Sequence, residues 1–259
     1  MTYHDLTEEL CALAHKAGAA ILDIYENASA IEISKKDDDS PLTAADKASN
    51  EVICAGLEQL PLSYPIISEE NKAVAYETRK NYDYYWLVDP LDGTKEFIKR
   101  NGEFTVNIAL IHQGQAVLGI VYAPVLDEMY YASKGQGAFL QKDNKTERLQ
   151  APSFRQTDNG LNVVCSRSHL NEETQKFVDA LDAPNLVPKG SSLKFLLLAT
   201  GAAHLYPRIA PTMEWDTAAA QAVLEEAGGK ILQYGSDQAL EYNKENLLNP
   251  SFVAQGNMA

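Results

Sequence analysis

The stretch Trp86-Leu87-Val88-Asp89-Pro90-Leu91-Asp92-Gly93-Thr94 ends an apolar run with two carboxylates. The run has the composition of a buried strand, Pro90 cannot donate to a β-ladder, and Gly93 permits a tight turn. We therefore expect a strand that delivers Asp89 and Asp92 at its carboxyl end, where α/β sheets bind ligands. Two aspartates directly behind a buried strand cost free energy unless something binds there.

The spacing of the two carboxylates separates several kinds of site. An EF-hand needs Asp-x-Asp-x-Asp-Gly, and an aspartyl-phosphate phosphatase of the haloacid dehalogenase type has Asp-x-Asp-Gly-Thr, with one residue between its carboxylates. Here two residues intervene, and the sequence has no P-loop. What remains is Asp-x-x-Asp as a pair of metal ligands, hard oxygen donors that suit magnesium.

Three other acidic positions stand at the ends of predicted elements: Glu69-Glu70 after an apolar strand, Asp216 at a helix start, and Asp46 in the first turn of a helix. Each has a local explanation. Asp46 follows Thr43 by three residues and completes a capping box, Asp216 complements a helix dipole, and the two glutamates suit a solvated loop. Taken singly, Asp46 and Asp216 are better explained in that way.

Hydrophobic periodicity predicts an α+β / α/β chain in two parts. The first has helices over 5–26 and after Thr43 and an antiparallel sheet; the second alternates strands and helices. Over the whole chain, the expected strands are 31–34, 64–68, 84–88, 105–111, 116–122, 128–132, 138–140, 161–165, 186–188 and 203–206. The expected helices of the second part are 171–181, 191–200 and 216–227. The polar stretch 141–159 contains Pro152 and is the expected boundary between subdomains 1–155 and 156–259.

The composition limits the function. A formal charge of −14, from 36 acidic and 22 basic residues, opposes binding to nucleic acid or an anionic membrane surface. A phosphate substrate then needs a locally positive site, which bound divalent metals would supply. Three scattered cysteines, no secretory leader pattern and no membrane-length apolar run predict a cytoplasmic protein with no integral membrane segment.

Over nearly its whole length, the chain resembles the inositol monophosphatase superfamily. The resemblance rests on Asp89-Pro90-Leu91-Asp92-Gly93-Thr94, on Glu69-Glu70, and on Trp215-Asp216-Thr217-Ala218-Ala219 followed by Gly228-Gly229. Within it, Lys95-Glu96-Phe97 is similar to the bacterial 3′(2′),5′-bisphosphate nucleotidases of the CysQ type. Further matching stretches are 40–46, 100–107, 166–169, 190–194 and 206–208. Glu214 departs from the residue types usual at its position, which is not a metal ligand in the superfamily.

The resemblance implies a layered α-β-α-β-α sugar-phosphatase fold and a magnesium-dependent, lithium-sensitive hydrolase of sulfur metabolism. It assigns one metal to Glu69, Asp89 and the Leu91 carbonyl, a second to Asp89, Asp92 and Asp216, and a third, weaker ion to Glu69. Its catalytic set is Asp46, Thr94 and Glu69, with Thr94, hydrogen-bonded to Asp46, taking a proton from a metal-activated water. The implied substrate contacts are Gly93, Thr94, Arg167, Ser191, Ser192, Lys194 and Arg208, and Lys36 belongs to a loop that could close over the site.

Two rival functions stay open. An inositol or other sugar monophosphatase would use the same chemistry, and Lys95-Glu96 disfavours it. A non-catalytic metal-binding regulator would need the carboxylates without Thr94 and Asp46. The sequence leaves open whether the chain is a monomer or a homodimer. It also leaves open whether the chain attaches peripherally to the inner membrane.

Overall fold

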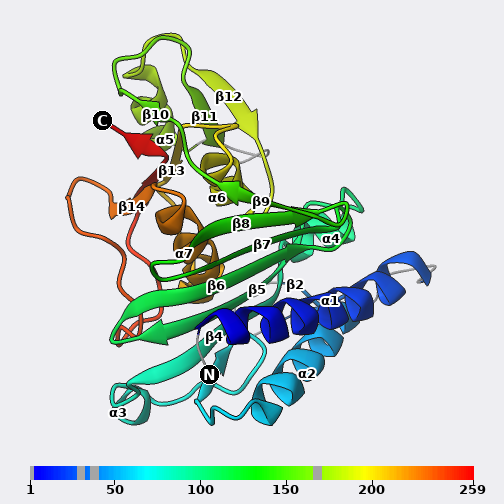
Figure 1. Cartoon of the computed structure of the whole chain (residues 1–259). Helices are drawn as coiled ribbons and strands as arrows, with labels where there is room; N and C mark the ends of the chain where they lie inside the picture. Colours follow the sequence, from blue (N-terminus) through cyan, green and yellow to red (C-terminus); the bar gives the residue numbers. More distant parts are fainter. Residues whose placement is uncertain (1–2, 28–32, 36–40, 166–170) are drawn as a thin grey trace.

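The computed structural model describes residues 3–27, 33–35, 41–165 and 171–259. Two sheets and three sets of helices alternate in five layers, which Figure 1 shows from α1 and α2 at the bottom to α5 at the top. The predicted α-β-α-β-α layering is thus confirmed. No helix within the described ranges is both long and apolar enough to cross a bilayer.

The larger sheet has seven strands in sequence order, β3 to β9. β3 and β4 pair in parallel, and every later neighbour is antiparallel. The strands are β3 Ile66–Ser68, β4 Tyr84–Asp92, β5 Thr105–His112, β6 Gln115–Ala123, β7 Glu128–Ser133, β8 Gly137–Lys142 and β9 Lys145–Leu149. The antiparallel sheet is therefore confirmed and is larger than predicted.

Helices cover both faces of this sheet. α1 (Tyr3–Asn27) and α2 (Ala44–Gln59) pack on one face, where Ile108 and Leu110 are buried. α6 (Leu193–Ala199) and α7 (Ala218–Glu226) share the core of the other face with Ala109 and Ile111. Because both faces are buried, the central strands are apolar almost throughout instead of alternating with polar residues.

The contact between α7 and the large sheet depends on a glycine. A Cβ added to Gly119 of β6 would lie 2.2 Å from the carbonyl oxygen of Ala219. Only a residue without a side chain allows the helix backbone to approach the strand so closely. The amino-terminal end of α7 is thereby held against the large sheet.

The smaller sheet has the order β12-β11-β13-β15-β14, with parallel pairs on the β12 side and antiparallel pairs on the β14 side. α5 (Glu172–Asp179) covers its outer face, where Val163, Val178 and Leu205 form a third apolar cluster. The strands are β11 Asn162–Cys165, β12 Asn185–Pro188, β13 Leu205–Arg208, β14 Lys230–Gln233 and β15 Phe252–Gln255. The remaining elements are the pairs β1 Ile33–Lys35 with β2 Pro41–Thr43 and β10 Ser153–Phe154 with β16 Asn257–Met258, and the short helices α3 Tyr76–Arg79 and α4 Thr94–Ile98.

Two local predictions need correction. The polar stretch 141–159 contains an unpredicted strand, β9, whose polar side chains face solvent at the edge of the large sheet. The subdomain boundary expected in this stretch stays a prediction. The predicted helix 216–227 begins instead at Ala218, after a short 3₁₀ turn, η1 (Glu214–Asp216). The turn forms because the Asp216 carboxylate accepts the Met213 amide proton at 2.9 Å.

Candidate metal centre

The end of β4 is a β-bulge. Asp89 pairs with Asn107 and Asp92 pairs with Thr105, so three residue steps on β4 oppose two on β5. The bulge lies between Asp89 and Asp92, and the Pro90 carbonyl within it accepts a hydrogen bond from Ser49 Oγ at 2.7 Å. A bulge re-aims the side chains that flank it, so two aspartates that strand geometry would place on opposite faces can serve one site.

Three distant segments bring carboxylates to this point. Glu69 follows β3, and its amide donates to the Val88 carbonyl of β4 at 3.1 Å. Asp216 comes from η1, at the amino end of α7. One carboxylate oxygen from each of Glu69, Asp89 and Asp216 lies within 4.8 Å of the others. Such a set of close, hard oxygen donors fits Mg²⁺ or a similar divalent cation.

The carboxylates repel one another in a buried setting. Burial, followed by the charge of Glu69, raises the pKa of Asp89 well above its ordinary value, and the Asp89 side chain is only 1% exposed. Burial raises the pKa of Asp216 to about 8, with the Asp92 charge adding to it, and the pKa of Asp92 to about 6. A bound cation would favour the ionised forms of Asp89 and Asp216 at neutral pH.

Thr94 and Asp46 meet beside the carboxylates. Thr94 Oγ1 donates to Asp46 Oδ1 at 3.1 Å and also lies 3.4 Å from the Leu91 carbonyl oxygen. The other oxygen of Asp46 accepts the Thr43 amide and hydroxyl, at 2.8 and 2.6 Å. Asp46 therefore completes the capping box of α2 and also accepts the Thr94 hydrogen bond, and its catalytic role stays a prediction.

Gly93 allows the chain to turn from β4 into α4. Its φ of 97° lies in the left-handed region, and an added Cβ would lie 3.0 Å from the Glu103 carbonyl oxygen and 3.1 Å from Ser191 Cβ. The turn leaves Gly93 and Thr94 at the wall of a cavity of about 670 Å³. The cavity is lined by Glu69, Asp92, Gly93, Thr94, Lys95, Glu96, Pro211, Thr212, Met213, Trp215, Asp216 and Leu248.

Lys194 and Arg208 supply positive charge beside the carboxylates. The Lys194 charge lowers the pKa of Asp92, and the Arg208 charge lowers that of Asp216, against the larger effect of burial. Lys194 Nζ also lies 5.6 Å from the centroid of the Tyr206 ring. Arg208 Nε is buried and has no hydrogen-bond partner among the described residues.

The predicted substrate residues have different surroundings. Ser191 and Ser192 are buried, and both hydroxyls bond to Thr105 of β5, at 3.1 and 2.7 Å; Ser192 Oγ also donates to Asn107 at 2.8 Å. Their hydroxyls hold the start of α6 on β5, and substrate contact by them stays a prediction. Arg167 and Lys36 lie outside the described residues.

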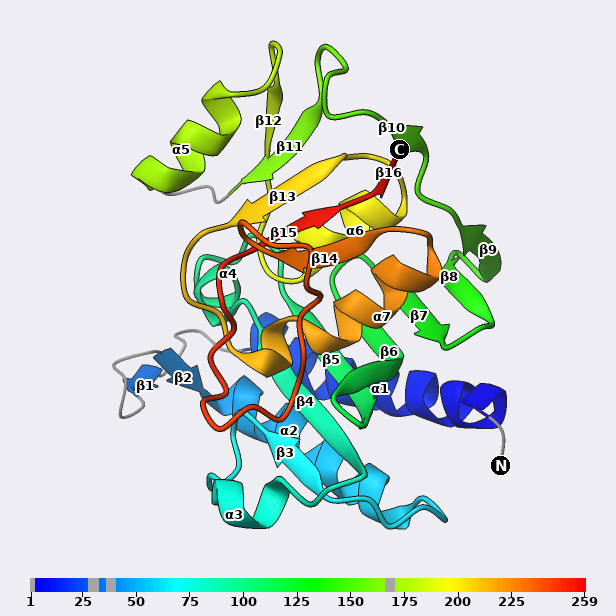
Figure 2. The ribbon, with the colours of Figure 1, turned by 90° about the vertical axis from the view of Figure 1, so that its left-hand side faces the viewer.

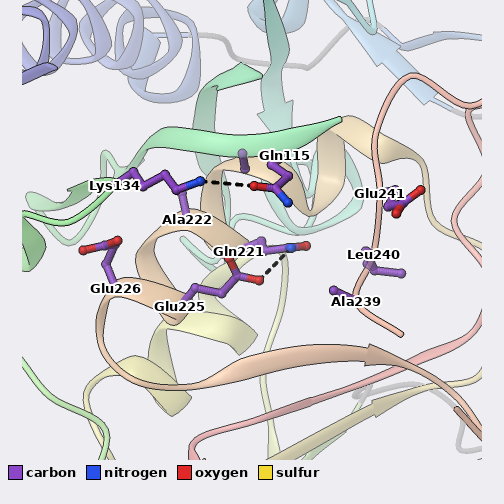
Figure 3. A pocket seen from close by; sticks show the side chains of 10 residues that line it. Gln115, Lys134, Gln221, Ala222, Glu225, Glu226, Ala239, Leu240 and Glu241 are labelled. Atoms are coloured by element: carbon purple, nitrogen blue, oxygen red, sulfur yellow. Dashed lines mark hydrogen bonds between the residues drawn. The ribbon is translucent and has the colours of Figure 1, made fainter. Parts of the chain in front are cut away.

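Pro211, Thr212 and Leu248 were missed by sequence reasoning. They line the cavity because the chain before η1 pairs with a segment near the carboxyl terminus, and Met213 bridges to Leu248. No short-range pattern marks such a pairing. A second, smaller cavity, at the carboxyl end of α7, has Glu225, Glu226 and Lys134 among its lining residues (Figure 3). It contains none of the predicted site residues.

Comparison with known proteins agrees with this geometry. The model of the inositol monophosphatase family matches residues 2–257, and the chain belongs to that family. It is 48% identical over 248 residues to the 3′(2′),5′-bisphosphate nucleotidase CysQ of Salmonella typhimurium, covering 95% of this chain and 98% of the relative. The corresponding CysQ of Escherichia coli K12 is 44% identical over the same length and the same shares.

A solved structure gives the same picture. The crystal structure of CysQ from Bacteroides thetaiotaomicron, described as a bacterial member of the inositol monophosphatase family, superposes with a TM-score of 0.83 at 42% identity. The match covers 96% of this chain and 97% of that one. The fold of this chain therefore matches that of a solved relative over nearly its whole length.

Proposed function

We propose that this chain is a magnesium-dependent 3′(2′),5′-bisphosphate nucleotidase, which hydrolyses 3′-phosphoadenosine 5′-phosphate to AMP and phosphate. The observation that carries the proposal is the convergence of Glu69, Asp89 and Asp216 within 4.8 Å beside the Thr94–Asp46 pair. The substrate follows from the CysQ relatives, which are 44–48% identical over nearly the whole chain.

Five groups would hold the metals. We assign one ion to Glu69, Asp89 and the Leu91 carbonyl, a second to Asp89, Asp92 and Asp216, and a weaker third to Glu69. The bound ions would neutralise the buried carboxylates, offset the repulsion between an acidic protein and a phosphate dianion, and lower the pKa of a water molecule in the site. Asp89 would help to hold the first and the second ion.

The Thr94 hydroxyl would direct the proton transfer. It donates to Asp46 Oδ1, so its lone pairs are free to accept a proton from the attacking water while its own proton moves toward Asp46. Asp46 is held for this role by its bonds to Thr43. The amides of Gly93 and Thr94, at the start of α4, would donate to the phosphate oxygens.

The second phosphate of the nucleotide would bind to Lys194 and Arg208. Both side chains bring positive charge close to Asp92 and Asp216, and no described residue accepts a hydrogen bond from the buried Nε of Arg208. Guanidinium and ammonium groups are the usual partners of phosphate. An inositol monophosphate has no second phosphate for these cations, which disfavours that alternative.

Phosphate release should be measured from 3′-phosphoadenosine 5′-phosphate and, in parallel, from inositol 1-phosphate, with magnesium and with a chelator. We expect magnesium-dependent release from the nucleotide and little from the inositol ester. Asp89→Asn should abolish release from the nucleotide, whereas Asp83→Asn, a matched change at an exposed residue just before β4, should not.

The other outcomes separate the alternatives. Release mainly from the inositol ester would keep the metal chemistry and refute the nucleotide assignment. Magnesium binding without release from either ester would instead favour a non-catalytic metal-binding regulator.

A further inference from the structure

Glu214, two residues before the ligand Asp216, lies outside the metal site and has no role in the proposed reaction. Its side chain is completely buried, which is unusual for a glutamate. Oε2 accepts the Asn243 amide at 2.6 Å, and Oε1 accepts the Lys244 amide at 3.1 Å and Lys244 Nζ at 2.5 Å. Three donors from one segment therefore satisfy this carboxylate.

The segment 243–249 lies between β14 and β15, and Figure 2 shows this connection descending along β4 toward α3. Its hold on η1 is not limited to the Glu214 carboxylate. The Glu214 amide donates to the Leu247 carbonyl at 2.9 Å, and Asn249 Nδ2 donates to the Met213 carbonyl at 2.8 Å and to Thr217 Oγ1 at 3.1 Å. The residues on both sides of Asp216 are thus bound to this segment.

The same segment is anchored to the large sheet through Arg79 of α3. The Arg79 side chain is buried, and it donates to Asn243 Oδ1 and to the Glu245 carbonyl, both at 2.8 Å. Asn243 returns a hydrogen bond to the Arg79 carbonyl at 2.7 Å. α3 follows Glu69 along the chain, so segment 243–249 joins the two regions that supply Glu69 and Asp216.

The orientation of Asp216 depends on this arrangement. Its Oδ2 accepts the Met213 amide, and Met213 is in turn bridged to Leu248. If segment 243–249 moved, the Met213 amide would move with it, and the carboxylate of Asp216 would lose its fixed direction toward Glu69 and Asp89.

We propose that Glu214 is a positioning residue for the metal ligand Asp216, acting through its bonds to Asn243 and Lys244. Groups that orient metal ligands without touching the metal commonly affect affinity by about 10- to 100-fold when removed. The proposal rests on the proposed function for its choice of metal, but its test includes a direct measurement of metal binding.

The test compares Glu214→Gln, Lys244→Met and Lys244→Arg with the unaltered protein. Magnesium binding is measured by titration calorimetry, and hydrolysis of 3′-phosphoadenosine 5′-phosphate is measured as a function of magnesium. We expect Glu214→Gln to weaken magnesium binding by about tenfold or more and Lys244→Met to weaken it less. Lys244→Arg, which keeps the positive charge, should bind magnesium as the unaltered protein does. At saturating magnesium, the KM for the nucleotide should stay within about twofold of the original value.

A matched control is Glu128→Gln. It breaks a comparable pair, Glu128 with Lys142 at 2.7 Å, which joins β7 to β8 and does not line the metal cavity. The control should leave magnesium binding unchanged, whatever its effect on melting temperature.

The inference is refuted if Glu214→Gln and Lys244→Met lower only the melting temperature and bind magnesium as tightly as the unaltered protein. If Glu214→Gln does not fold, Lys244→Met still decides, because it keeps both backbone bonds to Glu214. If the unaltered protein binds magnesium but leaves the nucleotide intact, the proposed function fails and calorimetry still tests the role of Glu214.

Discussion

Thr94 Oγ1 donates a hydrogen bond to Asp46 Oδ1 across 3.1 Å, joining residues 48 positions apart beside the carboxylate cluster. The bond gives the threonine hydroxyl a fixed direction next to the carboxylates proposed to bind metal. It also links two structural units, because Asp46 caps α2 and Thr94 begins α4. The capping box of α2 consists of Thr43 and Asp46 and does not require Thr94 beside it.

Removal of the Thr94 hydroxyl should impair the chemical step. We expect Thr94→Ala to lower kcat by about 10²-fold or more, the usual contribution of a positioned proton-transfer group. Thr94→Ser keeps the hydroxyl and should retain most of the activity. The measurement is kcat for 3′-phosphoadenosine 5′-phosphate at saturating magnesium; an alanine variant within about threefold of the original would contradict the proposed role.

The stability of the metal-free protein should fall as the pH rises. The ordinary pKa of an aspartate is 3.8, and in the folded protein that of Asp92 is about 6 and that of Asp216 about 8, chiefly because of burial. Between these values the folded state binds more protons than the unfolded state, so the free energy of unfolding decreases with rising pH. The stabilisation present at low pH is therefore lost as the pH passes through about 6 and about 8.

The stability of the Asp216→Asn variant should depend less on pH, because an asparagine side chain cannot ionise. In chelator, its melting temperature should match the original near pH 4 and exceed it at pH 9. With saturating magnesium at pH 9, the original protein should have the higher melting temperature, because the metal stabilises only the protein with its full ligand set. Parallel melting curves of the two proteins across this range would contradict the assignment.

The turn at Gly93 should tolerate no side chain. Gly93→Ala combines a left-handed φ with a Cβ contact of 3.0 Å to the Glu103 carbonyl oxygen. We expect a loss of about 1–3 kcal/mol in the free energy of unfolding, and lower activity because α4 and Thr94 shift. Denaturant unfolding measures the first effect. Gly135→Ala is a suitable control, because Gly135 also has a positive φ but no atom within 4 Å of an added Cβ.

Lys194 and Arg208 should distinguish one phosphate from two. We expect Lys194→Met and Arg208→Met to raise the KM for 3′-phosphoadenosine 5′-phosphate by about tenfold or more, because a charge-assisted contact to the second phosphate is lost. The KM for 3′-AMP, which lacks that phosphate, should change little. An equal rise for both substrates would show that the cations act on the reacting phosphate or on the metal ligands.

Local sequence signals were sufficient wherever one element decides the structure. The apolar run before Asp89, the turn at Gly93 and the cap at Thr43 were each predicted, because strand burial, left-handed turns and helix caps depend on a few neighbouring residues. The edge strand β9 was missed since its residues are polar, and only its pairing with β8 makes it a strand.

By itself the sequence determined which residues could bind a metal and the ends of the strands and helices on which they lie. Tertiary structure decided which of them meet. Glu69 and Asp216 lie far apart in the sequence, one after β3 and the other in η1. Their carboxylate oxygens come within 4.8 Å of each other because β3, β4 and η1 end at one place. It also directed the Ser191 and Ser192 hydroxyls to β5 and the Glu214 carboxylate to Lys244. A buried polar group bonds to whatever donor or acceptor the packed fold brings to it, and that partner is not encoded in its neighbours along the chain.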